Sequence, residues 1–268
     1  MKPEISVIMS EYNTDLQYLE AAIKSILRQT FSEFEFIIVD DSGKHNLEKY
    51  ILRFNDPRIR VIDNKKNMGL VYSLNEALNA SRGRYVVRMD TDDIAYPDRI
   101  YKQLNFIKKN PQYSVVSSRA IEFDDIDDQG VLGKSGEKLK YNISRGDSLI
   151  HPSVIMKRNE ILKVGGYDYF DRAEDLGLWL KLLANGKRLY VMDDVLIRYR
   201  VNSRDYTKRR ILNRKGEISA RLYYYPKLNV GFLPYLIIIK SLIAGLLPIA
   251  FVRWYRKIFI LKSAGATK

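Results

Sequence analysis

The sequence predicts an α/β fold with a mostly parallel central sheet, and three observations support this prediction. In roughly the first 110 residues, short apolar runs typical of buried strands alternate with segments whose apolar positions follow helical spacing. Such alternation predicts βαβ units, in which consecutive strands lie parallel. Polar and acidic residues follow several of these strands, where open sheets of this kind bind their ligands.

The expected elements follow one another regularly. Strands are expected at residues 5–9, 34–39, 60–62 and 85–89, with helices at 16–28, 47–54 and 70–80. Further along we expect a helix at 97–109, strands at 113–117, 153–156 and 195–199, a solvated acidic loop at 124–130, a turn at 165–166 and a helix at 176–184. The run 5–9 is too short for the apolar part of a signal peptide, which supports its assignment as a strand.

Length and composition limit the possibilities. The chain of 268 residues can form one large domain, or a domain with an appendage, around an ample core. It contains no cysteine, which excludes disulfides and zinc–thiolate sites and fits a reducing compartment.

The run Met89-Asp90-Thr91-Asp92-Asp93 places three carboxylates in four positions at the end of an expected strand. Like charges this close repel unless something neutralises them. Hard cations such as Mg²⁺ do so, and they prefer one or two carboxylates together with phosphate oxygens of a substrate. The alternative is a solvated acidic turn in which Asp92 or Asp93 caps the next helix. Short motifs of this kind often match by chance.

Polar residues at the ends of neighbouring strands favour the ligand site. Ser10, Asp40, Asp41, Asp90 and Asp92 each follow an expected strand. Because the carboxyl ends of parallel strands share one edge of a sheet, these side chains are expected to meet there. The sequence therefore suggests a metal-bridged diphosphate site.

Segments over about residues 4–200 together resemble the large family 2 of inverting glycosyltransferases, which have the GT-A fold. Each match alone is weak, but the ordered set is specific. The matching pieces are residues 5–13, Gln29-Thr30-Phe31, Ile38-Val39-Asp40-Asp41-Ser42, Asn67-x-Gly69 with Asn75, Asp90-Thr91-Asp92-Asp93 with Pro97-Asp98-Arg99, His151-Pro152-Ser153, Gly165-Gly166-Tyr167, and Glu174-Asp175 with Leu178-Trp179-Leu180. The resemblance implies a GT-A catalytic domain over residues 1–205, with a nucleotide-binding half to about 110 and an acceptor-binding half over about 111–205.

The resemblance implies donor-binding roles for five residues. Ser10 and Tyr12 would line the nucleotide pocket, and Asp41 would accept the uracil N–H of a uridine donor. Asn67 and Gly69 would belong to a loop that closes over the nucleotide. The alternatives are a turn-forming Asp at position 41 and a simple turn at 67–69.

The resemblance also implies a metal site and a catalytic base. Asp92 would be the main ligand of Mn²⁺ or Mg²⁺, and Asp90 would contact the ribose or the metal. Of the pair Glu174-Asp175, we choose Asp175 as the base that deprotonates an acceptor hydroxyl attacking the anomeric carbon with inversion. Both acids could instead be favourable charges at a helix N-terminus. His151 could reach the diphosphate or metal, although a lone histidine is more often structural.

Two departures from the family pattern bear on mechanism. Ser10-Glu11 stands where Pro-Val is common, so a charge enters the first loop and the donor contacts there become less certain. Nothing after Asp175 matches the Gln-x-x-Arg-Trp signature of processive polysaccharide synthases. We therefore expect addition of one sugar per encounter.

The charge is concentrated at the C-terminal end. The formal net charge is +13, and residues 181–268 contain 19 Lys+Arg against 4 Asp+Glu, whereas residues 1–180 contain 26 against 28. This asymmetry indicates an anionic surface, either nucleic acid or acidic lipid, that one end of the molecule contacts. The cluster Lys208-Arg209-Arg210 would add to that attraction.

The apolar segment 232–252 is long enough to span a membrane, but Lys240 near its middle would cost ~2.5–3.5 kcal/mol. From residue 249 onward, apolar and basic positions separate onto two helical faces, as in helices that lie in the membrane interface. Residues 206–268 are therefore expected to form a basic, helical region attached to the anionic cytoplasmic face of the membrane. The alternatives are a true span, a dimer interface or a helix packed on the catalytic domain.

Together these features predict an enzyme that moves one sugar from a nucleotide-sugar, most readily a UDP-sugar, to a glycan or polyprenyl-diphosphate-linked acceptor in surface polysaccharide or lipopolysaccharide-type synthesis. The alternatives are a non-catalytic relative and a binder of nucleic acid. The aromatic residues of the C-terminal end accompany a long apolar stretch rather than a polar groove, so lipid is favoured over nucleic acid. A haloacid dehalogenase-type phosphatase fits poorly, because Ile94 occupies the position that needs Thr or Val.

Overall fold

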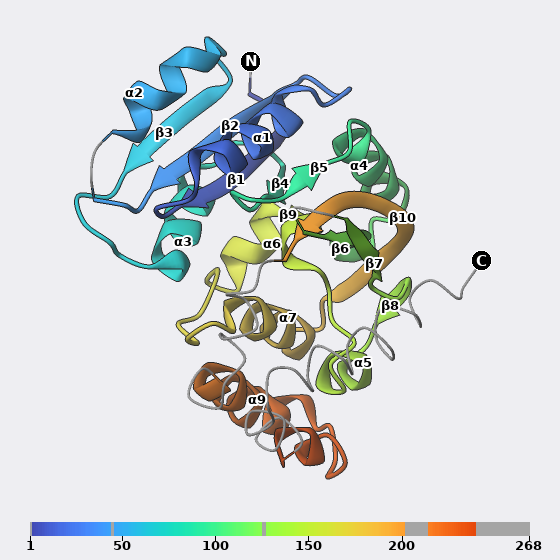
Figure 1. The fold of residues 1–268 in the computed structure, drawn as a ribbon. Helices are drawn as coiled ribbons and strands as arrows, with labels where there is room; N and C mark the ends of the chain where they lie inside the picture. The colour runs from blue at the N-terminus through green and yellow to red at the C-terminus, as the bar shows by residue number, and fades with distance from the viewer. Residues whose placement is uncertain (1, 44–45, 125–126, 202–213, 240–268) are drawn as a thin grey trace.

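The computed structural model describes residues 2–43, 46–124, 127–201 and 214–239. Its centre is a ten-stranded mixed sheet with the main order β3-β2-β1-β4-β9-β6-β10-β5, to which β7 and β8 add at β6 and β10. Helices cover the sheet on both sides, and helix α9 lies beside α7 at the lower end of the molecule (Figure 1).

The N-terminal half is the parallel part of the sheet. Its strands are β1 (Ile5–Glu11), β2 (Phe34–Asp40), β3 (Ile59–Asp63) and β4 (Tyr85–Arg88), all parallel to their neighbours. They are connected by α1 (Leu16–Leu27), α2 (Leu47–Ile51) with the 3₁₀ turn η1 (Leu52–Phe54), and α3 (Leu70–Ala80). The parallel arrangement brings the carboxyl ends of β1, β2 and β4 to one edge.

The second half mixes strand directions. The strands are β5 (Ile94–Ala95), β6 (Tyr113–Phe123), β7 (Asp128–Leu132), β8 (Gly136–Lys138), β9 (Ile155–Lys157) and β10 (Arg188–Arg200). Strand β9 runs antiparallel between β4 and β6, whereas β10 is parallel to β6. The helices are α4 (Arg99–Lys109), α5 (Lys140–Ser144), η2 (His151–Ser153), α6 (Arg158–Lys163), α7 (Glu174–Ala184) and α9 (Lys215–Leu228).

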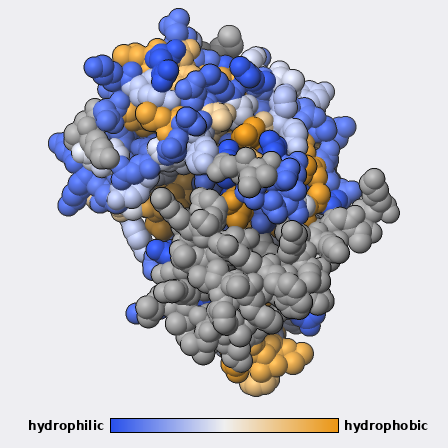
Figure 2. Space-filling model, in the orientation of Figure 1, coloured by the Kyte–Doolittle hydropathy of each residue, from blue (hydrophilic) through white to orange (hydrophobic). Residues whose placement is uncertain are grey.

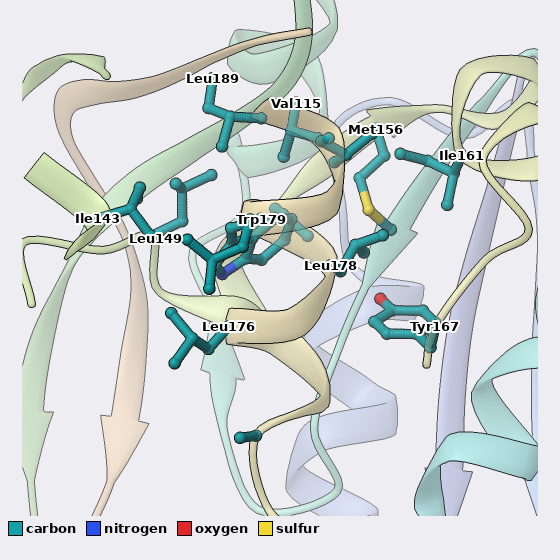
Figure 3. Packing of buried hydrophobic residues seen from close by; sticks show 14 of the residues in the cluster. Val115, Ile143, Leu149, Met156, Ile161, Tyr167, Leu176, Leu178, Trp179 and Leu189 are labelled. Atoms are coloured by element: carbon teal, nitrogen blue, oxygen red, sulfur yellow. The ribbon is translucent and has the colours of Figure 1, made fainter. Parts of the chain in front are cut away.

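The sheet is buried on both faces, as expected for a largely parallel sheet. Alternate residues of one strand enter different core layers, so Ile8 packs with the layer under α7 and Val7 with the layer under α1 and α4. In the first layer Trp179 of α7 is fully buried and Leu178 is packed beside it, with Tyr167 nearby (Figure 3). This packing fixes the N-terminus of α7 against the sheet.

Most predicted elements are present, with differences at their ends. The helix expected from residue 97 begins at Arg99, the strand expected at 195–199 begins at Arg188, and part of the expected acidic loop forms β7. The strand expected from Ser153 begins at Ile155, because residues 151–153 form a 3₁₀ turn. The sequence did not predict β5, β8, α5 or α6, which are short and depend on pairing or packing with distant segments.

Helix α9 belongs to the region for which we expected membrane attachment, and it packs against α7. In the part of the chain that the structure describes, no helix combines the length and apolar character needed to cross a membrane. The predicted interfacial helix from residue 249, Lys240 and the cluster at 208–210 lie outside the described residues.

Candidate active site

The acidic run forms a cluster just beyond the carboxyl end of β4. Carboxylate oxygens of Asp90, Asp92 and Asp93 all lie within 4.8 Å of one another. Asp90 and Asp92 are half-buried, whereas Asp93 is buried. Three converging carboxylates with two of them reachable from solvent provide the hard oxygen ligands that Mg²⁺ and Mn²⁺ prefer, so the residues fit the predicted metal.

Two buried arginines, Arg88 and Arg99, interact with this cluster. The guanidinium of Arg88 forms an ion pair with Asp90. Arg99 Nη2 donates to the carbonyl oxygen of Arg88 at 2.8 Å, and burial lowers the pKa of Arg99 to about 9. Within the described residues, Arg88 Nε and Nη1 have no hydrogen-bond partner. The acidic turn is therefore partly neutralised from within the protein.

Asp93 connects the acidic turn to the last strand of the sheet. Its Oδ1 accepts a hydrogen bond from the backbone N–H of Arg200 at 2.8 Å, and Arg200 Nε donates to the carbonyl oxygen of Asp92 at 2.9 Å. Burial, followed by the charges of Asp90 and Asp92, raises the pKa of Asp93 well above its usual value. Asp93 does not cap the next helix, because that helix begins at Arg99.

Asp41 follows β2 and holds the loop at 67–69. Its Oδ1 accepts from Asn64 Nδ2 and the backbone N–H of Met68, and its Oδ2 accepts from the backbone N–H of Gly69, each at 2.8 Å. Asn67 Oδ1 also accepts from the Gly69 N–H, at 2.9 Å. The structure thus brings together Asp41, Asn67 and Gly69, and the Asp41 carboxylate already accepts hydrogen bonds from three protein donors.

The first loop has a buried charge and an exposed ring. Ser10 is half-buried at the carboxyl end of β1, whereas Tyr12 is 53% exposed. Glu11, the departure from the family pattern, is buried, and its Oε1 accepts from the backbone N–H of Thr14 at 2.8 Å. Thr14 Oγ1 in turn donates to Thr91 Oγ1 at 2.8 Å, so this loop is tied to the acidic turn.

Glu174 and Asp175 begin α7, and their carboxyl groups have raised pKa values. Burial, followed by the charge of Asp175, raises the pKa of Glu174 to about 7. Burial also raises the pKa of Asp175, whose Oδ1 accepts from the Leu176 N–H at 2.6 Å. The charge of Asp90 raises both pKa values and that of Arg88 lowers both, so these acids share one electrostatic environment.

His151 lies beside Glu174 and is buried. Its Nε2 is 2.9 Å from the hydroxyl oxygen of Tyr167, and its Nδ1 is 3.9 Å from Glu174 Oε1. Burial, followed by the charge of Arg88, lowers the pKa of His151 well below its usual value. Both causes disfavour the charged imidazolium, and within the described residues His151 does not join the carboxylate cluster at 90–93.

A cavity of about 400 Å³ lies between the loop held by Asp41 and the start of α7. The residues that line it include Met68, Gly69, Tyr169, Phe170 and Glu174. Its volume is within the range of small-ligand pockets, ~300–1,000 Å³. It therefore offers space for a substrate group next to the proposed acid pair.

Sequence reasoning missed several residues that organise the site. They are Arg88, Asn64, Thr14 and Arg200, together with Tyr167, which belongs to a matched segment but had no assigned role. Only Arg88 left a usable signal, because a charged residue in an otherwise apolar strand requires a buried partner. The other four act through long-range contacts that spacing does not show.

Comparison with known proteins identifies the family. The profile described as "Glycosyl transferase family 2" matches residues 6–159, more than half of the chain. The chain belongs to glycosyltransferase family 2. The matched span includes Asp41, the cluster at 90–93 and His151, whereas Glu174 and Asp175 follow it.

One curated relative of this glycosyltransferase aligns over almost its whole length. The Escherichia coli UDP-Gal:alpha-D-GlcNAc-diphosphoundecaprenol beta-1,3-galactosyltransferase is 35% identical, over 93% of this chain and 94% of that protein. The relatives include further named glycosyltransferases, so the chain is an enzyme of this class.

Solved structures show the same fold at low sequence identity. Residues 1–349 of TarS from S. aureus, in complex with UDP-GlcNAc, match with a TM-score of 0.66 and 16% identity, over 97% of this glycosyltransferase and 77% of that chain. The mannosyltransferase PcManGT of Pyrobaculum calidifontis, in complex with GDP-Man and Mn²⁺, matches with a TM-score of 0.64 and 18% identity. The match covers 99% of this glycosyltransferase and 86% of that chain.

Proposed function

We propose that this glycosyltransferase moves one sugar from a UDP-sugar to a glycan acceptor carried on a polyprenyl diphosphate. The observation that carries this proposal is the near full-length similarity to the E. coli galactosyltransferase, whose name specifies UDP-Gal and a GlcNAc-diphosphoundecaprenol acceptor. A second relative, 27% identical over 67% of this chain, is named as a glucosyltransferase acting on the same class of acceptor. Both names describe steps of glycan assembly on a lipid carrier.

The donor would lie along the carboxyl edge of β1, β2 and β4. Ser10 and Tyr12 would contact the nucleoside, and the loop at 67–69 would cover it. Asp41 retains acceptor capacity on Oδ2, where one protein donor is bound, because a carboxylate oxygen can accept two hydrogen bonds. Because Asp41 is 2% exposed and held by this loop, the uracil N–H would reach Oδ2 only when the loop moves.

A divalent cation would be held by Asp92 and Asp90. The convergence of three carboxylates within 4.8 Å supports this assignment. Mn²⁺ or Mg²⁺, when bound, offsets the charge that grows on the leaving nucleoside diphosphate. Arg88 would hold the Asp90 carboxylate through their ion pair.

Asp175 would remove the proton of the acceptor hydroxyl as this oxygen attacks the anomeric carbon from the face opposite the diphosphate. The C–O bond to the acceptor forms as the bond to the diphosphate breaks, which inverts the anomeric centre. A carboxyl group whose pKa is raised by burial accepts a proton more readily than an exposed one. Glu174 would lie beside Asp175 in the same site. His151 would be positioned next to Glu174 by its hydrogen bond with the Tyr167 hydroxyl.

The enzyme would work at the cytoplasmic face of the membrane, attached peripherally. Support comes from the lipid-linked acceptors named for relatives and from the excess of basic residues after position 181. Basic groups near an anionic leaflet contribute about 1 kcal/mol each to binding.

The function is tested by donor binding and transfer measured together. Thermal unfolding is followed with UDP-Gal, UDP-Glc, UDP-GlcNAc and GDP-mannose, each with and without Mn²⁺. We expect one UDP-sugar to raise the Tm only with Mn²⁺, by the usual ligand linkage. Transfer of that sugar to GlcNAc-diphosphate carrying an alkyl chain is then followed by mass spectrometry.

Three variants separate the roles. Asp92→Asn should weaken both donor binding and transfer, whereas Asp175→Asn should keep donor binding and lose transfer. Asp98→Asn is the matched control, because its exposed ion pair with Lys102 contributes little. Near-normal transfer by Asp175→Asn would show that the base is another residue.

A further inference from the structure

We propose that a pocket between α7 and α9 is an acceptor subsite that binds a sugar ring of the glycan beyond the reacting sugar. This rests on the proposed function and extends it. The pocket has a volume of about 530 Å³, and Asp168, Phe170, Asn185, Tyr223, Tyr224 and Lys227 are among its lining residues. We call it the aromatic pocket.

Three rings form a corner of this pocket. The ring centroids of Phe170 and Tyr224 are 6.1 Å apart, those of Phe170 and Tyr223 are 6.2 Å apart, and those of Tyr223 and Tyr224 are 4.9 Å apart. Tyr223 is 55% exposed although it lies beside two other rings. A sugar ring has apolar C–H faces that pack on such surfaces.

Polar side chains line the same pocket as the three rings and could form hydrogen bonds with the hydroxyl groups of a sugar. Asn185 donates from Nδ2 to the Lys181 carbonyl oxygen at 2.9 Å, which leaves its side-chain oxygen available as an acceptor. Lys227 Nζ lies 3.5 Å from the centroid of Tyr223 and forms no ion pair within the described residues. The pocket thus offers both an acceptor and a donor next to the rings.

Hydrogen bonds and an ion pair hold two of the lining residues, Lys181 and Asp168, together. Lys181 is buried, and its Nζ donates to the Gly166 carbonyl oxygen at 2.9 Å and to Asp168 Oδ1 at 2.5 Å. The Tyr224 hydroxyl also donates to Asp168. Since Asp168 neutralises Lys181, the pocket does not present the paired cations that a diphosphate would need, and its polar groups do not suit a lipid tail.

The position of the pocket connects it to the reaction. Phe170 lines both the aromatic pocket and the cavity that contains Glu174. The segment from Asp168 to Glu174 therefore runs between the two spaces: Asp168 lines the aromatic pocket, and Glu174, the residue before the proposed base, lines the other cavity. A glycan whose terminal hydroxyl reaches Asp175 can extend past Phe170 toward α9.

The test uses saturation-transfer NMR on the full-length chain with UDP and Mn²⁺ present. The probes are methyl β-galactoside, methyl β-glucoside, methyl N-acetyl-β-glucosaminide and lactose. We expect at least one probe to receive saturation from the wild-type protein. In Tyr223→Ala this binding should be roughly tenfold weaker, as expected for loss of an aromatic contact, and Lys227→Met should weaken it through loss of a hydrogen-bond donor.

The control is Tyr101→Ala, because Tyr101 has the same 55% exposure as Tyr223 but lies on α4. It should keep the wild-type signal. Absence of saturation for every probe, or equal signals in wild type and Tyr223→Ala, would overturn the subsite. The Tm shift that UDP causes in the same samples tests the proposed function separately. If UDP with Mn²⁺ does not raise the Tm, UDP-sugar use is refuted, whereas the saturation-transfer result for the sugar probes stands.

Discussion

Arg88 offsets part of the negative charge that gathers among the acids of the site. Its buried guanidinium pairs with Asp90, and its charge lowers the pKa values of Glu174 and Asp175. Such a charge is costly to bury unless it is paired, and removing one partner of a buried pair leaves the other uncompensated.

We therefore predict that Arg88→Met destabilises the protein in urea unfolding, by less than the ~3–5 kcal/mol of a fully buried ion pair, because Asp90 is only half-buried. Mn²⁺ should raise the Tm of this variant more than that of wild type, because a cation at Asp90 and Asp92 replaces part of the lost charge. Arg88→Lys, which retains a charge, is the control. An equal Mn²⁺ effect in all three proteins would argue against this role.

Glu174 should make stability depend on pH. Its pKa is raised from 4.5 to about 7, so the unfolded chain loses this proton before the folded protein does. The resulting destabilisation builds as pH rises from the unfolded value to the folded value and is complete above about pH 7. As the pH rises from 5 to 8, the free energy of unfolding of Glu174→Gln should increase by roughly 2–3 kcal/mol relative to that of wild type. Urea unfolding of both proteins without metal measures it, and parallel pH curves would contradict it.

At the scale of elements, the sequence predicted the parallel half of the sheet well, because the spacing of apolar residues and the positions of turn residues indicate the same strands and helices there. The runs that became β1, β2 and β4 are mostly apolar, with Ser6, Glu35 and Arg88 as their interior polar residues, and each run is followed by a polar residue at the site. The site residues at strand ends were predictable for the same reason. Residues such as Arg200 and Asn64 were not, because their contacts join segments more than 20 residues apart.

Helix α9 approaches the segment before α7 at Gly216. A Cβ at this position would lie 2.0 Å from the carbonyl oxygen of Asp171. Replacing a helical glycine by alanine ordinarily stabilises a protein by about 0.5–1 kcal/mol. We predict the opposite sign for Gly216→Ala, with a lower Tm. Ser219→Ala, on the same helix, is the control, and a stabilised Gly216→Ala would show that α9 does not dock this closely.

The turn at 165–166 allows a comparison of two adjacent glycines. Both have positive φ, +84° at Gly165 and +66° at Gly166, but only a Cβ at Gly166 would meet a neighbour, Asn75 Oδ1 at 2.4 Å. Asn75 holds Tyr167 through two backbone hydrogen bonds of 2.8 and 2.9 Å. Gly165→Ala should therefore cost only backbone strain, about 1–2 kcal/mol. Gly166→Ala should cost clearly more in urea unfolding; equal losses would exclude a role for the Asn75 contact.

At the scale of the whole molecule, charge and apolar surface are both found toward the C-terminal end. Phe232 is 75% exposed and Leu233 is 64% exposed, just beyond α9. Figure 2 shows apolar surface at the lower end of the molecule, where the chain beyond α9 lies in Figure 1. Exposed apolar side chains beside basic residues are typical of surfaces that enter the membrane interface. Sequence composition predicted this end as the place of attachment, but the geometry beyond residue 239 is not described.

We predict that the full-length chain floats with phosphatidylglycerol vesicles at low salt and much less with phosphatidylcholine vesicles, because basic residues near an anionic surface add about 1 kcal/mol each. Salt should reduce the binding by screening. The double variant Phe232→Ser/Leu233→Ser should bind at least about tenfold more weakly, since each apolar side chain contributes ~1.5–3 kcal/mol when buried. Leu52→Ser, at a 73% exposed leucine in η1, is the control. Salt-sensitive binding to DNA without binding to the anionic vesicles would instead favour a nucleic-acid partner for the basic end.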